Sequence, residues 1–155
     1  MVNGDVLNKL RRFCAYQERC HEEVRTKLLS LKIYGEDLEE VMQALIEEDF
    51  LNEERFARTY AGGKFRMKKW GRQKITRELQ LRKISEYCIR KAMEEIPVDD
   101  YNKTLIQQLD AAMQKYTGDP FVVRSKAAGY LIAKGYEHDA VWELIRKKYP
   151  HKKSI

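Results

Sequence analysis

The sequence predicts an all-α protein made of three tandem three-helix repeats that form an elongated, curved array. Apolar residues recur at spacings of three and four along nearly the whole chain, and no stretch alternates with period two for long enough to predict a strand. Glycine (8) and proline (3) are few among 155 residues, which disfavours a turn-dense all-β protein. With 43% hydrophobic residues, the chain can bury a core.

The repeat appears when the chain is compared with itself. A shift of 51 residues places the apolar positions of the first third on those of the second, and a further shift of 52 reaches the last third. The matched sets are Val24, Leu28, Ile33 and Leu38; Ile75, Leu79, Ile84 and Ile89; and Ala127, Leu131, Tyr136 and Val141. Neither shift needs a gap across the second and third helices. We therefore expect repeats over 5–48, 49–98 and 99–148, followed by a basic tail over 149–155.

Capping signals divide the repeats into helices. In the first repeat, Gly35 interrupts the pattern and an acidic helix over 36–48 follows. Asn52 begins the second repeat as an N-cap with Glu53 and Glu54 behind it, and Ser85 is a second candidate cap. In the third repeat, Gly118-Asp119-Pro120 is typical of a helix end, an N-cap and a proline at the first helical position.

Charge is unevenly distributed along the chain, although the total is only +6. Residues 36–54 hold nine acids and no base, whereas residues 55–91 hold 13 bases and two acids. The flanking segments add +3 over 1–35 and +1 over 92–155. A concentration of Lys and Arg favours binding to nucleic-acid phosphates, because those cations release condensed counterions. The alternative is a solvated face balanced by the acidic helix.

Within the basic segment, one helical seam carries most of the large apolar side chains. Its members follow spacings of 4, 3, 4 and 3 and are predicted to be core: Phe56, Tyr60, Gly63, Met67 and Trp70. Arg66 and Lys69 then point towards solvent. On the next helix, Lys74 and Arg77 lie opposite the buried side, so two adjacent helices are expected to present outward cations.

Signatures of enzymes, metal sites and membrane spans are missing from the sequence. It contains no GxxxxGK[ST], GxGxxG, GxSxG or HExxH motif, so we expect no enzymatic activity and no cofactor. The group Cys14, Cys20, His21 and Cys88 lacks a recognised zinc-ligand spacing, so no metal is expected. No run of about 18 apolar residues predicts a membrane helix. Three cysteines without a CxxC favour a soluble cytoplasmic protein, and we expect a monomer.

Two stretches resemble the RecX family of regulatory proteins. The central one is Phe50-Leu51-Asn52-Glu53-Glu54-Arg55-Phe56-Ala57-Arg58-Thr59-Tyr60, continuing through Lys69-Trp70-Gly71, Lys74-Ile75, Leu79 and Lys83-Ile84. The other is Tyr16-Gln17-Glu18-Arg19-Cys20-His21 with Glu23-Val24-Arg25 and Lys27-Leu28; Lys134-Gly135-Tyr136 matches a third repeat more loosely. Two departures stand out. Lys32 and Lys83 occupy positions where the family has glycine, and Asn52-Glu53 replaces an acidic pair.

This resemblance implies a modulator of the bacterial recombinase RecA. Family members are built from tandem three-helix repeats, bind the groove of the RecA nucleoprotein filament, and inhibit its ATPase and strand exchange. By this resemblance, basic residues of the second repeat would face single- or double-stranded DNA within the filament or acidic RecA surface. These are Lys64, Arg66, Lys68, Lys69, Arg72, Lys74, Arg77, Arg82 and Lys83, with Arg19, Arg25 and Lys27 as secondary candidates.

Two other hypotheses remain open from the residues themselves. The chain could be a helical nucleic-acid-binding protein without a recombinase partner. It could also be a metal-dependent enzyme that uses the Cys20-His21 region. The basic tail, Arg146-Lys147-Lys148 through His151-Lys152-Lys153, could touch nucleic acid or simply be a frayed, solubilising end.

Overall fold

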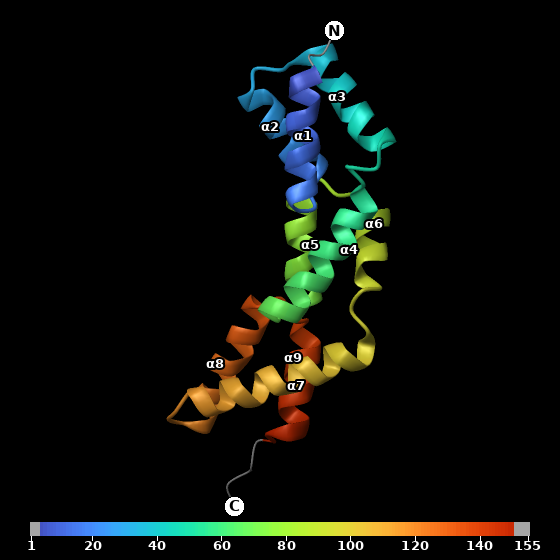
Figure 1. Ribbon diagram of the computed structural model, residues 1–155. Helices are drawn as coiled ribbons and strands as arrows, with labels where there is room; N and C mark the ends of the chain where they lie inside the picture. The colour runs from blue at the N-terminus through green and yellow to red at the C-terminus, as the bar shows by residue number, and fades with distance from the viewer. Residues whose placement is uncertain (1–3, 151–155) are drawn as a thin grey trace, which may run out of the picture. The chain divides into compact units, whose positions relative to one another are not determined.

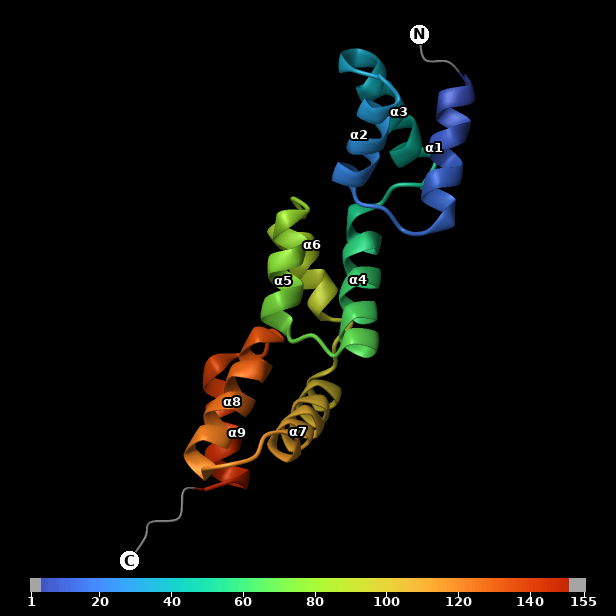
Figure 2. The ribbon, with the colours of Figure 1, turned by 90° about the vertical axis from the view of Figure 1, so that its left-hand side faces the viewer.

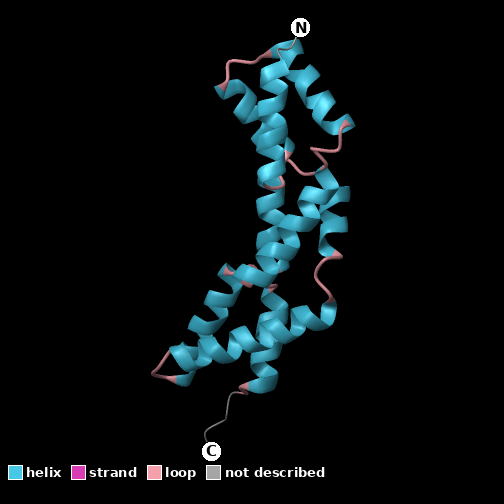
Figure 3. Cartoon of the chain, in the orientation of Figure 1, coloured by secondary structure: helices cyan, strands magenta, loops and turns pink. Residues whose placement is uncertain are grey.

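The computed structural model describes residues 4–150, and this part of the chain is helical with short connections and no strand (Figures 1 and 3). The elements, in chain order, are α1 (Gly4–Tyr16), α2 (His21–Ser30), α3 (Gly35–Glu47), α4 (Glu53–Gly63), the π-helical turn η1 (Lys64–Lys68), α5 (Arg72–Leu81), α6 (Glu86–Met93), α7 (Val98–Lys115), α8 (Pro120–Ala133) and α9 (His138–Lys148). The predicted all-α class is confirmed. Across residues 4–150, every helix is too short or too polar to cross a membrane.

Helix starts follow the predicted caps. The Asn52 side-chain oxygen accepts the Arg55 N–H at 2.9 Å, and the Ser85 hydroxyl accepts the Cys88 N–H at 3.2 Å. At α8, the Asp119 carboxylate accepts the Phe121 N–H at 2.8 Å, with Pro120 at the first helical position. These bonds satisfy amide donors that lack a partner inside the helix. Residues 151–155 of the predicted basic tail lie outside the described residues.

The chain divides into two compact units. The first comprises residues through Tyr60 together with Leu79–Ala92, and the second comprises Ala61–Glu78 together with residues from Met93 onward. In the first unit, helices α1 to α3 surround an apolar core that also takes in Leu51. Its buried members are Leu10, Cys14, Val24, Leu28, Leu38, Val41, Met42, Leu45 and Leu51.

In the second unit, helices α7, α8 and α9 pack on one another, as Figure 2 shows. Their inward positions recur every three or four residues, as a helix with one buried face requires. The buried side chains are Tyr101, Leu105, Leu109, Ala112, Val123, Ala127, Ala128, Leu131, Tyr136, Val141 and Ile145.

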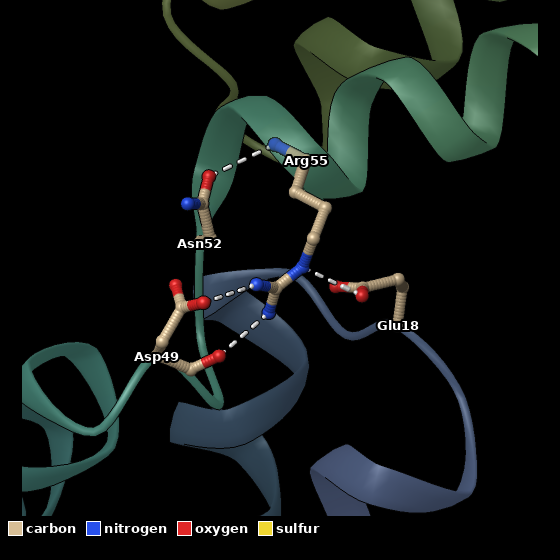
Figure 4. Close-up of polar contacts among 4 residues, drawn as sticks. All are labelled: Glu18, Asp49, Asn52 and Arg55. Atoms are coloured by element: carbon tan, nitrogen blue, oxygen red, sulfur yellow. Dashed lines mark hydrogen bonds and ion pairs between the residues drawn. The ribbon is translucent and has the colours of Figure 1, made fainter.

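Arg55 ties the start of α4 to two earlier segments of the first unit (Figure 4). Its guanidinium donates to the Glu18 carboxylate at 2.7 Å and to the Asp49 main-chain carbonyl at 2.9 Å. The Asp49 carboxylate lies 3.1 Å from the same group. One side chain thus joins the α1–α2 connection, the α3–α4 connection and the first turn of α4. Within the Phe50–Tyr60 motif, Arg55 therefore has a structural role.

Three turns share one left-handed residue and one hydrogen-bond pattern. Lys32, Lys83 and Gly135 have φ of 62°, 59° and 105°, and they are spaced by the same 51 and 52 residues that relate the apolar sets. In each turn the following N–H reaches the carbonyl five residues back: Ile33 to Leu28 at 3.0 Å, Ile84 to Leu79 at 3.1 Å and Tyr136 to Leu131 at 3.1 Å. This is the Schellman helix ending. Two lysines therefore adopt the conformation that glycine adopts in the third turn.

Replacing Lys32 with glycine should stabilise the protein. A side chain at positive φ costs about 1 kcal/mol, and Lys32→Gly removes that strain at an exposed position. We expect the free energy of unfolding to rise by about 1 kcal/mol in urea denaturation. The matched control is Lys9→Gly inside α1, where ordinary helical φ makes glycine destabilising by a similar amount. Equal losses of stability in both variants would contradict the strain at Lys32.

Candidate nucleic-acid interface

The predicted interface residues begin where α4 changes into a π-helical turn. In η1, the Lys69 N–H donates to the Phe65 carbonyl at 3.0 Å and the Trp70 N–H reaches the Lys64 carbonyl at 3.3 Å. Lys69 has φ of 59°, so the helix stops there in the left-handed conformation. Trp70 and Gly71 then lead directly into α5. The widened turn brings Trp70 back towards the residues that begin η1.

This turn breaks the predicted seam. Phe56 is buried as expected, but Met67 is 83% exposed and Trp70 is only half-buried. A π-helical turn holds more residues than an α-helical one, so a 3-4 spacing no longer stays on one face. Phe65, which is off the predicted seam, is buried instead. The prediction that Met67 belongs to the core was wrong.

Trp70 is flanked by two lysines. The ammonium nitrogen of Lys64 lies 4.9 Å from the centre of the Trp70 ring, and that of Lys74, in the first turn of α5, lies 4.5 Å away. Both distances are within the range of cation–π attraction. The indole therefore holds two ammonium groups within 4.9 Å of its ring centre, although like charges repel. This pairing gives the segment a concentrated positive charge with defined geometry.

The position of α5 is fixed by a close backbone contact at Gly71. The Gly71 N–H donates to the Lys134 carbonyl at 2.9 Å, and the Gln73 N–H donates to the Gly135 carbonyl at 3.0 Å. A Cβ on Gly71 would lie 2.2 Å from the carbonyl carbon of Gly135, and one on Gly135 would lie 2.4 Å from the Lys74 Cβ. Only glycine permits this approach. The contact holds the first turn of α5, with Lys74, against the α8–α9 turn.

Two buried tyrosines add hydrogen bonds to this contact between the start of α5 and the α8–α9 turn. The Tyr101 hydroxyl accepts the Arg72 N–H at 3.0 Å and donates to the Glu137 carboxylate at 3.0 Å, while the Tyr136 hydroxyl donates to the Lys69 carbonyl at 2.7 Å. Burial raises the pKa of both phenols, so they stay neutral donors. The amide of Arg72 lacks an intrahelical partner, and Tyr101 supplies one.

The other predicted residues of the second unit fall into two groups. Arg66, Lys68, Lys69 and Arg77 are exposed. Arg72 is half-buried: its guanidinium lies 4.0 Å from the centre of the Tyr101 ring and donates to the Ile96 carbonyl at 3.2 Å. Arg72 is therefore part of the packing that positions α5.

Arg82 and Lys83 belong to the first unit. The Arg82 guanidinium lies 4.8 Å from the centre of the Tyr60 ring, and the Lys83 ammonium is 3.6 Å from the Glu22 carboxylate. The predicted set of nine basic residues is thus divided, with seven in the second unit and these two in the first. Of these seven, Arg72 belongs to the packing, and the other six form the candidate interface.

The secondary candidates lie in the first unit, where two of them pair with acids. Arg19 stacks 3.8 Å above the Phe13 ring and is 3.4 Å from the Glu23 carboxylate. Arg25 lies 2.6 Å from the Glu39 carboxylate. The third, Lys27, lies 5.7 Å from the centre of the Phe13 ring.

The cysteines provide no metal site among residues 4–150. Cys14, Cys20 and Cys88 are all buried free thiols, and burial raises the pKa of each, to about 11 for Cys14. Within the described residues, no three His, Cys, Asp or Glu side chains are arranged to hold a metal ion.

Sequence reasoning missed the residues that position α5. Gly71 and Gly135 stand in the family-like stretches, but their contact joins segments 64 residues apart, and no local pattern predicts it. The polar roles of Tyr101 and Tyr136 were not predicted either, because a buried tyrosine in a periodic pattern looks like any other core residue. The available signal was that Gly71 and Gly135 stand outside any flexible, glycine-rich segment.

Comparison with known proteins identifies similar chains. Residues 52–93 match the family model "RecX, second three-helix domain". Regulatory protein RecX of Chlorobium phaeobacteroides is 28% identical over 137 residues, covering 86% of this chain and 87% of that protein. Regulatory protein RecX of Clostridium perfringens strain 13 is 26% identical over 132 residues, covering 83% of this chain but only 61% of the relative.

Two solved structures share the fold. The crystal structure of RecX from Lactobacillus salivarius has a TM-score of 0.81 at 21% identity, covering 91% of this chain and 92% of that one. Another crystal structure, of regulatory protein RecX, has a TM-score of 0.84 at 17% identity, covering 93% of this chain and 72% of that one. Both are likenesses of fold.

Alanine at Gly71 should destabilise the second unit. Its Cβ would overlap the Gly135 backbone, which cannot move without breaking two main-chain hydrogen bonds. We expect Gly71→Ala to lower the free energy of unfolding by about 3 kcal/mol in urea denaturation. Gly129→Ala in α8 is the control, because nothing lies within 4 Å of the added Cβ and the helix gains about 1 kcal/mol. Similar gains in both variants would show that the close contact is absent.

Proposed function

Because the chain belongs to the RecX family of regulatory proteins, we propose that it binds the nucleoprotein filament of the RecA recombinase and inhibits RecA ATPase and strand exchange. In this role it acts by binding, without a cofactor or a reaction of its own. The chain spans about three fifths of the length of the Clostridium perfringens relative.

One observation carries the proposal: the arrangement of Lys64, Trp70 and Lys74. The two ammonium groups lie within 4.9 Å of one ring centre, and Arg77 is exposed one turn further along α5. Phosphates of a nucleic acid are spaced regularly and bind such clustered cations by releasing counterions. Because the Trp70 ring already orients both ammonium groups, these cations meet a phosphate backbone with less loss of side-chain entropy. DNA within the filament is the proposed ligand of this surface.

Charge pairing in the first unit also supports the proposal. Two acids of the predicted acidic region are paired inside that unit, Glu39 with Arg25 and Glu48 with Arg11, each at 2.6 Å. Contact with these arginines lowers the pKa of both carboxyl groups, so they stay charged and paired at neutral pH. Such surface ion pairs contribute little to stability, but each one offsets an acidic charge with a basic one beside it. Part of the acidic charge is therefore balanced within its own unit.

A RecA titration tests the function. We expect the protein to inhibit ATP hydrolysis by RecA on single-stranded DNA at substoichiometric to near-stoichiometric ratios. The double charge reversal Lys74→Glu/Arg77→Glu should raise the half-inhibitory concentration about tenfold or more, because two phosphate contacts become repulsive. Hydrolysis and strand exchange are measured side by side.

The matched control is Lys103→Glu/Lys147→Glu, which changes the net charge equally at two exposed positions of the second unit. It should inhibit like the unaltered protein. Undiminished hydrolysis at several-fold excess of the protein over RecA would refute the proposal. If bare DNA binds while RecA activity is unchanged, the protein is instead a nucleic-acid-binding protein without a recombinase partner.

Trp70 should matter through the lysines that it holds. In Trp70→Leu the cation–π attraction is lost, and Lys64 and Lys74 separate because their charges repel. We expect RecA inhibition to weaken about fivefold, whereas Trp70→Phe should retain most of it. The measurement is the same ATPase titration, with thermal melting to confirm that both variants fold. Equal loss in the two variants would assign Trp70 to packing instead.

A further inference from the structure

A second cluster of lysines and aromatic rings lies on α7 and α8 of the second unit. Lys115 ends α7 and Tyr116 follows it, while Lys126, Tyr130 and Lys134 succeed one another at intervals of four residues on α8 and its C-cap. We name these five residues the lysine–tyrosine patch. Four-residue steps place the α8 members on one face, and Lys126 and Lys134 are about 12 Å apart along the helix axis.

The two tyrosine rings connect all three ammonium groups. Lys115 lies 5.4 Å from the Tyr130 ring centre and 5.7 Å from that of Tyr116. Lys134 shares the Tyr130 ring at 5.5 Å, and Lys126 shares the Tyr116 ring at 6.0 Å. Three cations therefore gather around two rings. Lys115 and Lys126 are exposed, Lys134 is half-buried, and Tyr130 is 37% exposed, so the patch is open to solvent.

The acids that stand nearest to this patch in the sequence have other bonds. The α8 sequence has no Asp or Glu, and Asp119 before it caps the helix by accepting the Phe121 N–H. Glu137 accepts the Tyr101 hydroxyl, and Asp110 lies 2.9 Å from the Lys148 ammonium. Lys134 donates to the neutral Gln108 amide at 2.8 Å. The gathered positive charge thus favours an anion supplied from outside the chain.

We propose that the lysine–tyrosine patch binds single-stranded nucleic acid. Its lysines would neutralise successive backbone phosphates, and the exposed Tyr130 ring would stack on an unpaired base. A row of cations with interspersed aromatic rings is the usual construction of surfaces that bind single strands without sequence preference. An acidic protein segment would use the lysines but not the aromatic face, so the exposed ring favours nucleic acid. The patch shares no residue with the Lys64–Trp70–Lys74 arrangement and needs no RecA.

Fluorescence polarisation with a labelled oligothymidylate of 15 nucleotides, across a series of salt concentrations, tests the patch. In Lys115→Gln/Lys126→Gln, two phosphate contacts are lost, so the slope of log affinity against log salt should fall by about 1.4. The matched control Lys103→Gln/Lys147→Gln removes the same charge from other faces of the second unit and should keep the original slope. Lys134 is left intact because of its bond to Gln108.

A second variant separates the aromatic contribution from charge. Tyr130→Leu should weaken binding of the oligothymidylate about fivefold or more and leave a duplex of equal length nearly unaffected, because paired bases cannot stack on the ring. Thermal melting by circular dichroism confirms folding of each variant.

Two results would overturn the proposal. One is an unchanged slope and affinity in Lys115→Gln/Lys126→Gln relative to its control. The other is displacement of the oligonucleotide by an equal concentration of a 15-residue polyglutamate peptide, combined with no effect of Tyr130→Leu, which would assign the patch to an acidic protein segment. Because RecA is absent from these measurements, failure here is distinguishable from failure to inhibit RecA.

Discussion

The second unit depends on the contact between Gly71 and Gly135. The two backbones are so close there that a Cβ on either residue would clash with the other segment. Two main-chain hydrogen bonds, from Gly71 to Lys134 and from Gln73 to Gly135, join the start of α5 to the α8–α9 turn. These bonds satisfy the N–H groups of Gly71 and Gln73 at the beginning of α5, and they fix the backbone position of Lys74. The candidate interface is thus a consequence of backbone packing as much as of charge.

The family-like motif and the candidate interface have different physical roles. Arg55, in the middle of the Phe50–Tyr60 stretch, bonds to Glu18 and Asp49, and Asn52 caps the same helix. All of these contacts lie inside the first unit and hold connections together. The most recognisable residues of the chain therefore describe how it folds, and recognising them does not locate where it binds.

The helical class, the three caps and the periodic turns could be predicted because each depends on residues close in sequence. Of the apolar sets related by 51 and 52 residues, all members except the partly buried Ile33 are buried, including Val24, Ile75 and Ala127. Even the left-handed turns at Lys32 and Lys83 follow the spacing, although lysine does not favour positive φ. What could not be predicted was the π-helical turn before Trp70, because no glycine or proline inside Lys64–Lys68 marks it.

The sequence predicted that the candidate site is rich in Lys and Arg, but it did not predict which of these residues lie together. Summing charge along the chain identified residues 55–91 but gave 92–155 a value near zero, which concealed Lys115, Lys126 and Lys134. In the structure, basic side chains differ in the group that they contact, which is either a carboxylate or an aromatic ring. Arg11, Arg25 and Arg55 contact carboxylates, which cancel their charge locally.

Lys74, Lys115 and Lys126 lie against aromatic rings instead, and a ring orients an ammonium group without neutralising it. A cation kept in place with its full charge is better suited to a phosphate than one already paired with an acid. On this basis the aromatic neighbour of a lysine, rather than the count of lysines in a segment, indicates where we propose that an anionic polymer binds. The same reasoning explains why a modest total of +6 is compatible with two strongly basic surfaces.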